Sequence, residues 1–391
     1  MLTSLGSMPN RDCHAMRQET NEGSCAARNP EPDGAVPAAA WKTQFRRRIL
    51  SWFRANARDL PCRKTRDPYA VWVSEIMLQQ TQVATVIGYF ERFLAAFPAI
   101  ADLAAADEHE VLRLWEGLGY YRRARQLYAA AAVIVAEHQG RFPREIDQIR
   151  SLPGIGRYTA GAIASIAWDA REPILEANTV RLFSRLLAYR GDAASSAGQQ
   201  RLWAFAAAIL PHKHVGLFNQ ALMELGSEIC TPRNPACDRC PVRPLCPTCR
   251  GGWQAQIPAA ARKPQYEDRH EAAVVVRRGH RVALRRCGPD ERWAGLWDFP
   301  RFPLTARSGD ALNRELELAT AERTGLIVRV GRKLATIKHG VTRFRITLVC
   351  YEAECAGGRL LRDRDVRWVD ISDLGQYPLS VTGRRISRLL G

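Results

Sequence analysis

A glycine turn, a short helix and a carboxylate occur in close succession between residues 152 and 178, and each has a chemical use. Gly154 and Gly156 leave backbone amides unobstructed directly before a stretch with helical apolar spacing, Tyr158 to Trp168, and Glu176 follows. Free amides and the positive end of a helix dipole suit a phosphate group. A lone Gly-x-Gly is also common where a loop simply leads into a helix, so other features must decide between these interpretations.

A second carboxylate, Glu75, lies within an otherwise apolar run from Tyr69 to Gln79 that has helical spacing. A carboxylate in such a run is costly unless it is paired, functional or turned to the surface. Directly after it, residues 79–82 (Gln-Gln-Thr-Gln) interrupt the apolar face, which resumes at Val83. This pattern predicts a polar wedge between two helices.

A loop with glycines, two tyrosines and two arginines, residues 117–123, connects two further expected helices, Leu103 to Trp115 and Ala124 to His138. These residue types fit a contact with the backbone of a nucleic acid. Tyrosines that cap a hydrophobic core explain the same composition equally well, so both interpretations remain open.

Five of the eleven cysteines fall within twenty residues, and this clustering predicts a metal site. Four have the spacing C-x6-C-x2-C-x5-C: Cys230, Cys237, Cys240 and Cys246. Four thiolates on one compact loop can surround either a tetrahedral zinc ion or an iron-sulfur cubane. Cys249 forms a further Cys-x2-Cys pair with Cys246, so counting alone does not fix the fourth ligand.

The 391-residue chain carries a net charge of +17, which favours a nucleic acid partner; the alternative is an arginine-rich, solvated surface. No apolar run approaches the roughly 20 residues of a membrane span, so we expect a soluble protein without a membrane partner. Residues 1–40 lack the apolar segment of a secretory signal. We therefore expect a reducing compartment, in which clustered thiols bind metal rather than form disulfides.

The chain divides by composition and periodicity into several parts. Residues 1–40 are polar and aperiodic and predict a disordered tail, whereas residues 41–250 are helical with no convincing strand. After a linker at 251–266, the periodicity changes from that of helices to that of strands. The fold class is therefore multi-domain: an all-α unit followed by an α+β domain over 267–391.

The C-terminal domain contains strands and one long helix with a Nudix-like pattern. Expected strands are Glu271–Val276, Arg281–Arg285, Leu334–Lys338, Phe344–Tyr351 and Val366–Val369, and the helix is Ala311–Thr324. Four residues of this stretch match the Nudix pyrophosphatase signature: Glu315, Glu317, Glu322 and Gly325. Its Arg-Glu pair and second glutamate are replaced by Leu318, Ala319 and Arg323. We infer a Nudix-like fold without that hydrolytic chemistry.

Taken together, these segments resemble the MutY-type adenine-DNA glycosylases of the helix-hairpin-helix superfamily. The matching runs are DPYAVWVSEIMLQQTQVATVIGYFERF (67–93), LWEGLGYYRRARQL (114–127), LPGIGRYTAGAI (152–163) and the four-cysteine loop. The resemblance is dense over 41–250 and thin over 265–391. It implies a [4Fe-4S] cluster on the four cysteines, mismatched double-stranded DNA as the partner, and a monomer acting in the bacterial cytoplasm on nucleoid DNA.

The resemblance also implies catalytic roles for four residues. Glu75 would protonate the adenine leaving group, Glu176 would stabilise or attack the sugar cation, and Asn178 would orient water or the acid. Tyr158 occupies the slot in which endonuclease III enzymes have the lysine that forms a Schiff base. A tyrosine cannot form one, so we expect a monofunctional glycosylase with water as the nucleophile.

Contacts to DNA are expected from three segments. A base inside a duplex must be extruded before its bond can be broken, and a wedge can fill the vacated stack. The wedge, the tyrosine loop and the glycine turn supply these residues: Gln79, Gln80, Thr81, Tyr120, Tyr121, Arg122, Gly154, Gly156 and Arg157.

Three departures from the family pattern bear on the substrate. The family has Asp-Gly-Asn where this chain has Glu176-Ala177-Asn178, and tryptophan where it has Cys62. The Phe-Ser-His sequence that reads 8-oxoguanine aligns with residues 341–343, so Thr342 and Arg343 are the candidate lesion readers. The leading hypothesis is removal of adenine opposite 8-oxoguanine or guanine. The alternatives are excision of thymine or uracil opposite guanine, and a catalytically weakened mismatch-binding protein.

Overall fold

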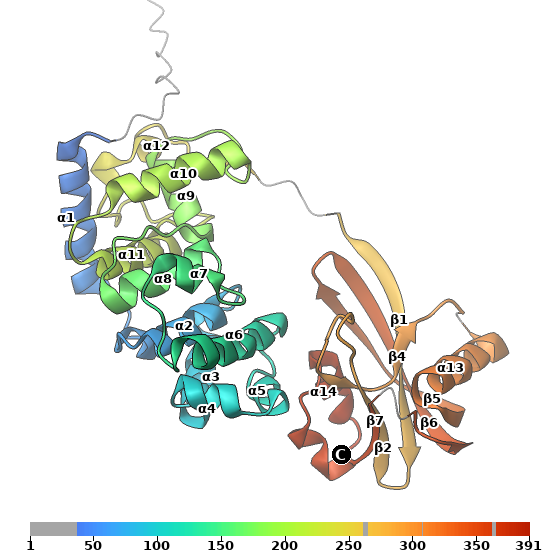
Figure 1. Cartoon of the computed structure of the whole chain (residues 1–391). Coiled ribbons are helices and arrows are strands. Elements are labelled where there is room, and N and C mark those ends of the chain that lie inside the picture. The colour runs from blue at the N-terminus through green and yellow to red at the C-terminus, as the bar shows by residue number, and fades with distance from the viewer. Residues whose placement is uncertain (1–36, 261–264, 307, 362–364) are drawn as a thin grey trace, which may run out of the picture. The chain divides into compact units, whose positions relative to one another are not determined.

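The computed structural model describes residues 37–260, 265–306, 308–361 and 365–391 (Figure 1). Most of the predicted tail at 1–40 and part of the predicted linker at 251–266 lie outside the described residues. The helical region and the C-terminal region are considered separately below.

Residues 37–260 are helical, and the described residues of this region contain no strand, as the sequence predicts. The α-helices are α1 Ala39–Asn56, α2 Pro68–Leu78, α3 Val83–Ala96, α4 Ile100–Ala105, α5 Glu108–Leu114, α6 Arg122–His138, α7 Ile146–Ser151, α8 Arg157–Trp168, α9 Ala177–Leu186, α10 Ser196–Ile209, α11 Val215–Glu224 and α12 Pro247–Arg250. A π-helical turn, Leu225–Ile229, extends α11. Among the described residues, none of the helices combines the length and the apolar character needed to span a bilayer.

Two hydrophobic cores divide the helical region into two lobes. One core is formed by α2 to α8 and has Trp72 and Trp115 at its centre, both fully buried. The other contains α1 together with α9, α10 and α11, and includes Phe45 and Phe183. The N-terminal helix therefore completes the lobe formed by the later part of this region. α2 and α8 belong to the first lobe and α9 to the second, which places the candidate catalytic residues where the lobes adjoin.

Capping residues explain where several helices begin. Asp67 accepts hydrogen bonds from the amides of Tyr69 and Ala70, and Pro68 occupies the first position of α2, where its missing N–H is not needed. The predicted single helix from Leu103 to Trp115 is wrong, because α4 ends at Ala105 and α5 begins at Glu108. Asp107 caps α5 by accepting from the amide of His109, and this cap interrupts the helix.

The C-terminal region is an α+β domain built on one seven-stranded sheet. Its elements are β1 Glu267–Arg278, β2 Arg281–Arg286, β3 Trp297–Asp298, β4 Arg301–Pro303, α13 Gly309–Thr324, β5 Leu326–Val341, β6 Phe344–Gly358, β7 Val366–Asp370 and α14 Val381–Ser387. The main order is β3-β2-β1-β6-β5, with β4 paired to β1 and β7 to β2. Only β1 and β6 are parallel among these pairs. The five strands expected from periodicity are confirmed, whereas short β3 and β4 carry too few residues for a periodic signal.

Both faces of this sheet are covered, as the alternation along β1 shows. Ala273 and Val275 pack in a core that includes Ile386 of α14, whereas Val274 packs in a core that includes Leu316 of α13. Side chains alternate between the faces of a strand, so a central strand covered on both sides is apolar throughout. The apolar run in β1 follows from this position.

Two of the three glutamates that match the Nudix signature, Glu315 and Glu317, have structural partners in the described region. Glu315 accepts hydrogen bonds from the amides of Thr305 and Ala306, at 2.8 and 2.6 Å, and Glu317 accepts from the amide of Val330. These carboxylates therefore fix the chain around α13.

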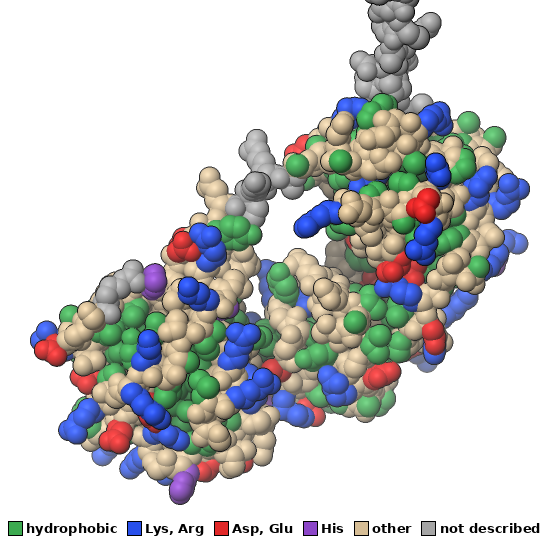
Figure 2. Space-filling model, turned by 180° about the vertical axis from the view of Figure 1, so that it is seen from behind, with side chains coloured by type: hydrophobic (Ala, Val, Ile, Leu, Met, Phe, Trp, Pro, Cys, Tyr) green, Lys and Arg blue, Asp and Glu red, His purple; other side chains and the backbone are tan. Residues whose placement is uncertain are grey.

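Basic side chains are distributed over the molecular surface. Figure 2 shows Lys and Arg side chains spread across the visible face rather than gathered in one patch. The net charge of +17 therefore does not by itself locate a DNA-binding surface.

Candidate active site

A pocket in the helical region brings together all four predicted catalytic residues. Its lining includes Glu75 from α2, Tyr158 from α8, and Glu176 and Asn178 at the start of α9. These residues are up to about a hundred positions apart in sequence, and the packing of three helices brings them to one place.

Glu75 is buried, with only 6% of its surface exposed, and its Oε2 accepts a hydrogen bond of 2.7 Å from the Tyr158 hydroxyl. Burial raises the pKa of Glu75 to about 7, against the opposing effect of the Tyr158 hydrogen bond. Glu176 raises this pKa further because two negative charges in one pocket repel each other. Glu75 can therefore hold a proton near neutral pH, as a general acid requires.

The second carboxylate, Glu176, caps the N-terminus of α9. It accepts hydrogen bonds from the amides of Asn178 and Thr179, each at 2.8 Å, and from the Asn178 side-chain amide at 3.1 Å. Burial raises the pKa of Glu176, while the two amides and Arg181 act in the opposite direction. Three N–H donors and a helix N-terminus favour the ionised form.

Close packing fixes Asn178 from behind. A Cβ atom on Gly226, in the π-helical turn, would lie 2.7 Å from the Asn178 Cβ. The side-chain oxygen of Asn178, Oδ1, accepts a hydrogen bond of 2.9 Å from Arg181. The side-chain NH2 group of Asn178 is therefore directed to Glu176. This arrangement orients the donor of Asn178.

A third pocket carboxylate, Glu224, has the opposite electrostatic environment to Glu75. Arg58 binds both of its oxygens, and Arg63 donates to Oε2 at 2.8 Å. Burial alone would raise the pKa of Glu224, but the hydrogen bonds from the two arginines outweigh it and lower the pKa to about 2. Glu224 is thus a fixed negative charge in the pocket, balanced by two guanidinium groups.

The predicted wedge is a tight turn after α2. Gln80 has a left-handed backbone (φ 55°) and is exposed, while the Gln79 side chain donates to the Thr159 hydroxyl of α8 at 3.3 Å. Thr81 lines the catalytic pocket. Positive φ at a residue other than glycine stores strain and is concentrated at functional sites.

The neighbouring tyrosine loop contains one exposed and one buried tyrosine. Tyr120 also has a left-handed backbone (φ 49°), and 51% of its surface is exposed. Tyr121 is buried, and its hydroxyl accepts a hydrogen bond of 3.3 Å from the Gly117 amide. Tyr120 is therefore accessible to a ligand, while Tyr121 holds the loop in shape.

Arg123 connects the wedge to the tyrosine loop. Its buried guanidinium donates to the Gln79 carbonyl and to the Thr81 hydroxyl (3.3 Å), and also to the Gly119 carbonyl (3.2 Å). Arg122, one residue earlier, is exposed. The two adjacent arginines thus differ in role, with Arg122 available to a polyanion and Arg123 acting as an internal clamp.

The glycine turn precedes α8 as the sequence predicts. Gly154 has φ 78°, and a Cβ atom there would lie 2.7 Å from the Gln126 Cβ, so this position requires glycine. Gly156 is the N-cap of α8 and supplies no capping side chain, and no atom lies within 4 Å of where its Cβ would be. Arg157 is exposed and lies over the Trp203 ring at 3.9 Å. The helix start is therefore open to an anion.

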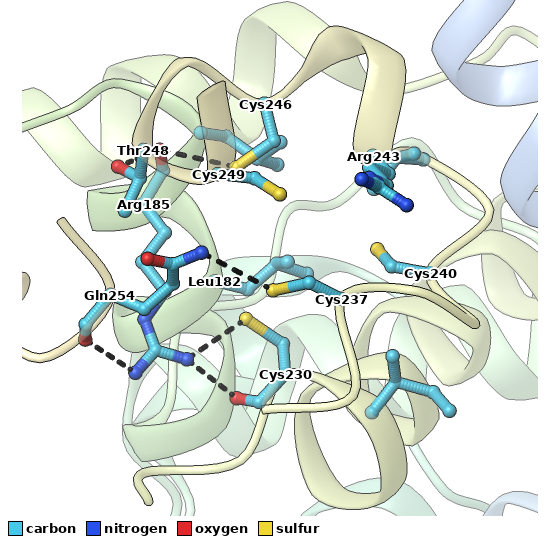
Figure 3. A pocket seen from close by; sticks show the side chains of 13 residues that line it. Leu182, Arg185, Cys230, Cys237, Cys240, Arg243, Cys246, Thr248, Cys249 and Gln254 are labelled. Carbon is cyan, nitrogen blue, oxygen red and sulfur yellow. Dashed lines mark hydrogen bonds between the residues drawn. The ribbon is translucent and has the colours of Figure 1, made fainter. Parts of the chain in front are cut away.

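The four predicted metal ligands line one cavity (Figure 3). Cys230 follows the π-helical turn, Cys237 and Cys240 lie in the loop, and Cys246 is the N-cap of α12. Arg185 donates to the Cys230 sulfur at 3.3 Å and Gln254 to the Cys237 sulfur at 3.7 Å. Hydrogen bonds of this kind stabilise metal-bound thiolates and tune the potential of iron-sulfur clusters.

The donor set fits the cluster that the resemblance implies. Four thiols line one cavity, and an iron-sulfur cubane takes one thiolate on each of its irons. Four cysteines can also hold a structural zinc ion, so the thiols alone fit either group.

The two candidate lesion readers lie at the tip of the hairpin between β5 and β6. Thr342 has a left-handed backbone (φ 51°), and its hydroxyl donates to the Val341 carbonyl at 2.7 Å. Arg343 is exposed and its guanidinium lies over the Phe344 ring at 5.1 Å. Both side chains are thus accessible on a tight turn.

Several residues that shape the site were not predicted from the sequence: Arg58, Arg63, Arg123, Arg181, Met223 and Glu224. Glu224, like Glu75, is a carboxylate within an apolar helical stretch, and this pattern could have identified it from the sequence. The arginines carried no such signal, because arginine is abundant throughout the chain.

Comparison with protein families gives three matches. Residues 73–207 match the HhH-GPD superfamily of base excision DNA repair proteins, residues 230–246 match the iron-sulfur binding domain of endonuclease III, and residues 272–388 match the NUDIX domain. The prediction of an iron-sulfur rather than a zinc loop is thereby confirmed, as is the Nudix-like fold of the C-terminal domain.

Several known proteins have similar sequences or folds. The chain is 43% identical over 268 residues to the adenine DNA glycosylase of Rattus norvegicus, covering 66% of this chain and 51% of that protein. It is 38% identical to the adenine DNA glycosylase of Buchnera aphidicola subsp. Schizaphis graminum, covering 66% of this chain and 75% of that protein. The chain thus spans about half the length of the rat relative. A solved thermostable thymine-DNA glycosylase is 29% identical, with a TM-score of 0.50, over 54% of this chain and 98% of its own.

Proposed function

Because the chain belongs to the adenine DNA glycosylase family of base excision repair proteins, we propose that it hydrolyses the N-glycosidic bond of adenine mispaired with 8-oxoguanine or guanine. The observation that carries this proposal is the buried Glu75, hydrogen-bonded to Tyr158 in a pocket that also holds Glu176. A carboxyl group that keeps its proton and a carboxylate that stays ionised are the two groups that this reaction needs.

The catalytic sequence follows from the two environments. Glu75 donates a proton to the extruded adenine, so that the base leaves as a neutral molecule while positive charge develops on the sugar. Glu176, held by the amides of α9, stabilises that charge or attacks the sugar, and Asn178 orients the water or the acid. Water then completes the hydrolysis.

The reaction stops at base removal. Tyr158 stands where the endonuclease III type has its lysine, and a phenol cannot form a Schiff base with the sugar. Its hydroxyl instead donates to Glu75 at 2.7 Å and lies 3.2 Å from the Met223 sulfur. Tyr158 therefore positions the catalytic acid, and the enzyme is monofunctional.

The partner is double-stranded DNA with a mismatch. The exposed Gln80 and Tyr120, fixed by Arg123 on neighbouring turns, fit the filling of the stack that an extruded base leaves. The open N-terminus of α8 at Gly156, with the Arg157 side chain beside it, suits a DNA phosphate. We propose that the protein acts as a monomer in the cytoplasm, on nucleoid DNA.

The opposite base is read by the hairpin of the C-terminal domain. Thr342 offers a hydroxyl and Arg343 a guanidinium at the turn where the family has Ser and His. An arginine fork donates two hydrogen bonds to the acceptor edge of a guanine. Guanine offers O6 and N7 as acceptors, whereas 8-oxoguanine carries a hydrogen on N7 and offers O6 and O8, so an arginine finds acceptors on both bases.

The proposal is tested with a duplex that contains one adenine opposite 8-oxoguanine, under single-turnover conditions. After incubation with the protein, alkali should cut the strand at the adenine, and without alkali the strand should stay intact. Absence of alkali-dependent cutting would contradict adenine excision, and cutting without alkali would contradict the monofunctional mode.

Excision of thymine opposite guanine is the second candidate, favoured by the similarity to a thymine-DNA glycosylase and by Cys62, which lines the pocket where the family has tryptophan. A panel of duplexes with A opposite 8-oxoguanine, A opposite G, T opposite G and U opposite G separates the two. The first proposal requires the two adenine substrates to react fastest.

A further inference from the structure

A fifth cysteine, Cys249, lines the same cavity as the four thiols of the iron-sulfur loop. It lies in α12, three residues after Cys246, the N-cap of that helix. Cys246 and Cys249 both line this cavity, from the start and from the third position of α12. Figure 3 shows the Cys249 sulfur pointing into the space that the sulfurs of Cys237 and Cys240 also face. The matched iron-sulfur domain ends at Cys246 and leaves Cys249 without a role.

The contacts of Cys249 are with the loop itself. Cys237 and Arg243 line the same cavity and interact electrostatically with its thiol. Cys246 interacts electrostatically with Cys249 and also with Cys230 and Cys237. The five sulfurs therefore form one group, although the family pattern uses four.

The position of α12 does not depend on a bond from Cys246 to a cluster. The Thr248 hydroxyl donates to the Arg185 carbonyl at 2.6 Å, and the Trp253 amide donates to the Thr248 carbonyl at 3.0 Å. Arg185 in turn donates to the sulfur and carbonyl oxygen of Cys230. These contacts hold α12 beside the loop, so Cys249 stays within the group if Cys246 is released.

We propose that Cys249 is a reserve ligand of the iron-sulfur cluster, whose thiolate takes the iron coordination site of Cys246 when that bond opens. The step is a ligand substitution: the iron bond to the Cys246 sulfur breaks and an iron bond to the Cys249 sulfur forms. The Cys249 proton passes to the departing Cys246 thiolate, and the oxidation state of the iron does not change. The proposal concerns retention of the cluster and does not depend on base excision.

The first test removes Cys246 in the full chain, with and without Cys249. Cys246→Ala should keep most of its iron and acid-labile sulfide, and its visible absorbance, after anaerobic purification, because Cys249 replaces the missing ligand. Cys246→Ala/Cys249→Ala should lose the cluster. Cys240→Ala is the matched control and should lose the cluster even with Cys249 present. Equal loss in the single and double variants at position 246 would overturn the proposal.

A second test leaves all four family ligands in place and so avoids a folding defect. The holoprotein and Cys249→Ala are mixed with an iron chelator without oxygen, and the decay of the visible absorbance is followed. Without Cys249, an iron released by Cys246 is not recaptured, so Cys249→Ala should lose its cluster several-fold faster. Equal rates would contradict the reserve role.

Discussion

The carboxyl groups of the pocket differ in pKa because their surroundings differ. Burial raises the pKa of Glu75 to about 7, whereas hydrogen bonds from two arginines overcome burial and lower the pKa of Glu224 to about 2. Groups of one type that are forced apart in pKa can hold different protonation states at the same pH. This difference, rather than the presence of carboxylates, suits Glu75 to the proposed role of the acid.

The raised pKa of Glu75 predicts a pH-dependent change in stability. A group whose folded pKa exceeds its ordinary value of 4.5 stabilises the fold fully below that value. This contribution is lost as the pH rises to about 7, where the folded protein also ionises. The free energy of unfolding of Glu75→Gln, measured relative to that of the wild type, should therefore rise by about 3 kcal/mol between acidic and neutral pH. Denaturant unfolding at both pH values measures it, and a constant difference between the two proteins would contradict the assignment.

Glu176 predicts a graded response to substitution. Glu176→Asp keeps a carboxylate that can cap α9, so base release should stay within about tenfold of the wild type. Glu176→Ala should lose about 1 kcal/mol of stability with the cap and nearly all base release. Single-turnover rates and thermal unfolding measure both effects. An inactive wild type that gains activity through Glu176→Asp would instead identify a weakened mismatch-binding protein.

At the scale of elements, Arg123 joins two strained turns into one unit. Gln80 and Tyr120 each have a left-handed backbone, and the Arg123 guanidinium bonds to carbonyls on both sides. Such strain persists only where the surroundings hold it. The clamp thus fixes the two exposed side chains that the proposal places at the DNA.

Replacing Arg123 should reduce both stability and base release, whereas replacing its neighbour Arg122 should not. Arg123→Met should cost about 3 kcal/mol of stability, because buried carbonyls lose their donors. Base release should fall by about a hundredfold, because the turns shift. Arg122→Ala is the matched control: it should leave stability unchanged and reduce the salt slope of DNA binding by about one. Equal effects of the two variants would contradict the division of roles.

Periodicity was sufficient to predict most of the helices and the longer strands, but not the roles of these two arginines. The apolar spacing of α2 and α8 and the change to strand periodicity after the linker are local properties, and the structure follows them. Arg122 and Arg123 are identical in type and adjacent, and only the tertiary packing turns one inward. Similarly, the single helix expected over 103–115 failed because the cap at Asp107 outweighs apolar spacing.

At the scale of the molecule, the chain combines a helical domain that holds the proposed catalytic residues with a sheet domain that carries the candidate reader. The catalytic pocket is lined by helical residues, whereas Thr342 and Arg343 lie at a hairpin tip of the other domain. The change in periodicity along the sequence predicted both domains. The reader residues were identified only by aligning residues 341–343 with the family pattern. Their position on an exposed turn required the structure, because turn geometry depends on the pairing of β5 with β6.

This division predicts that changes at the hairpin affect selectivity more than chemistry. Arg343→Ala should lower the preference for A opposite 8-oxoguanine over A paired with T by about tenfold, because a guanine-directed donor is lost. The intrinsic rate on the best substrate should change little. Arg345→Ala is the matched control, since Arg345 is engaged by Asp268 at 2.9 Å and should leave selectivity intact. Comparison of rates on the two duplexes for each variant is the measurement.

The central claim is that a buried, proton-holding Glu75 breaks the bond to adenine, and release of free adenine tests it most directly. A duplex with one adenine opposite 8-oxoguanine is incubated with excess wild type or Glu75→Gln, and binding and free adenine are measured on the same samples. The account predicts that both proteins bind the duplex equally and that only the wild type releases adenine. Release by Glu75→Gln at the wild-type rate, or no release by the wild type, would contradict it.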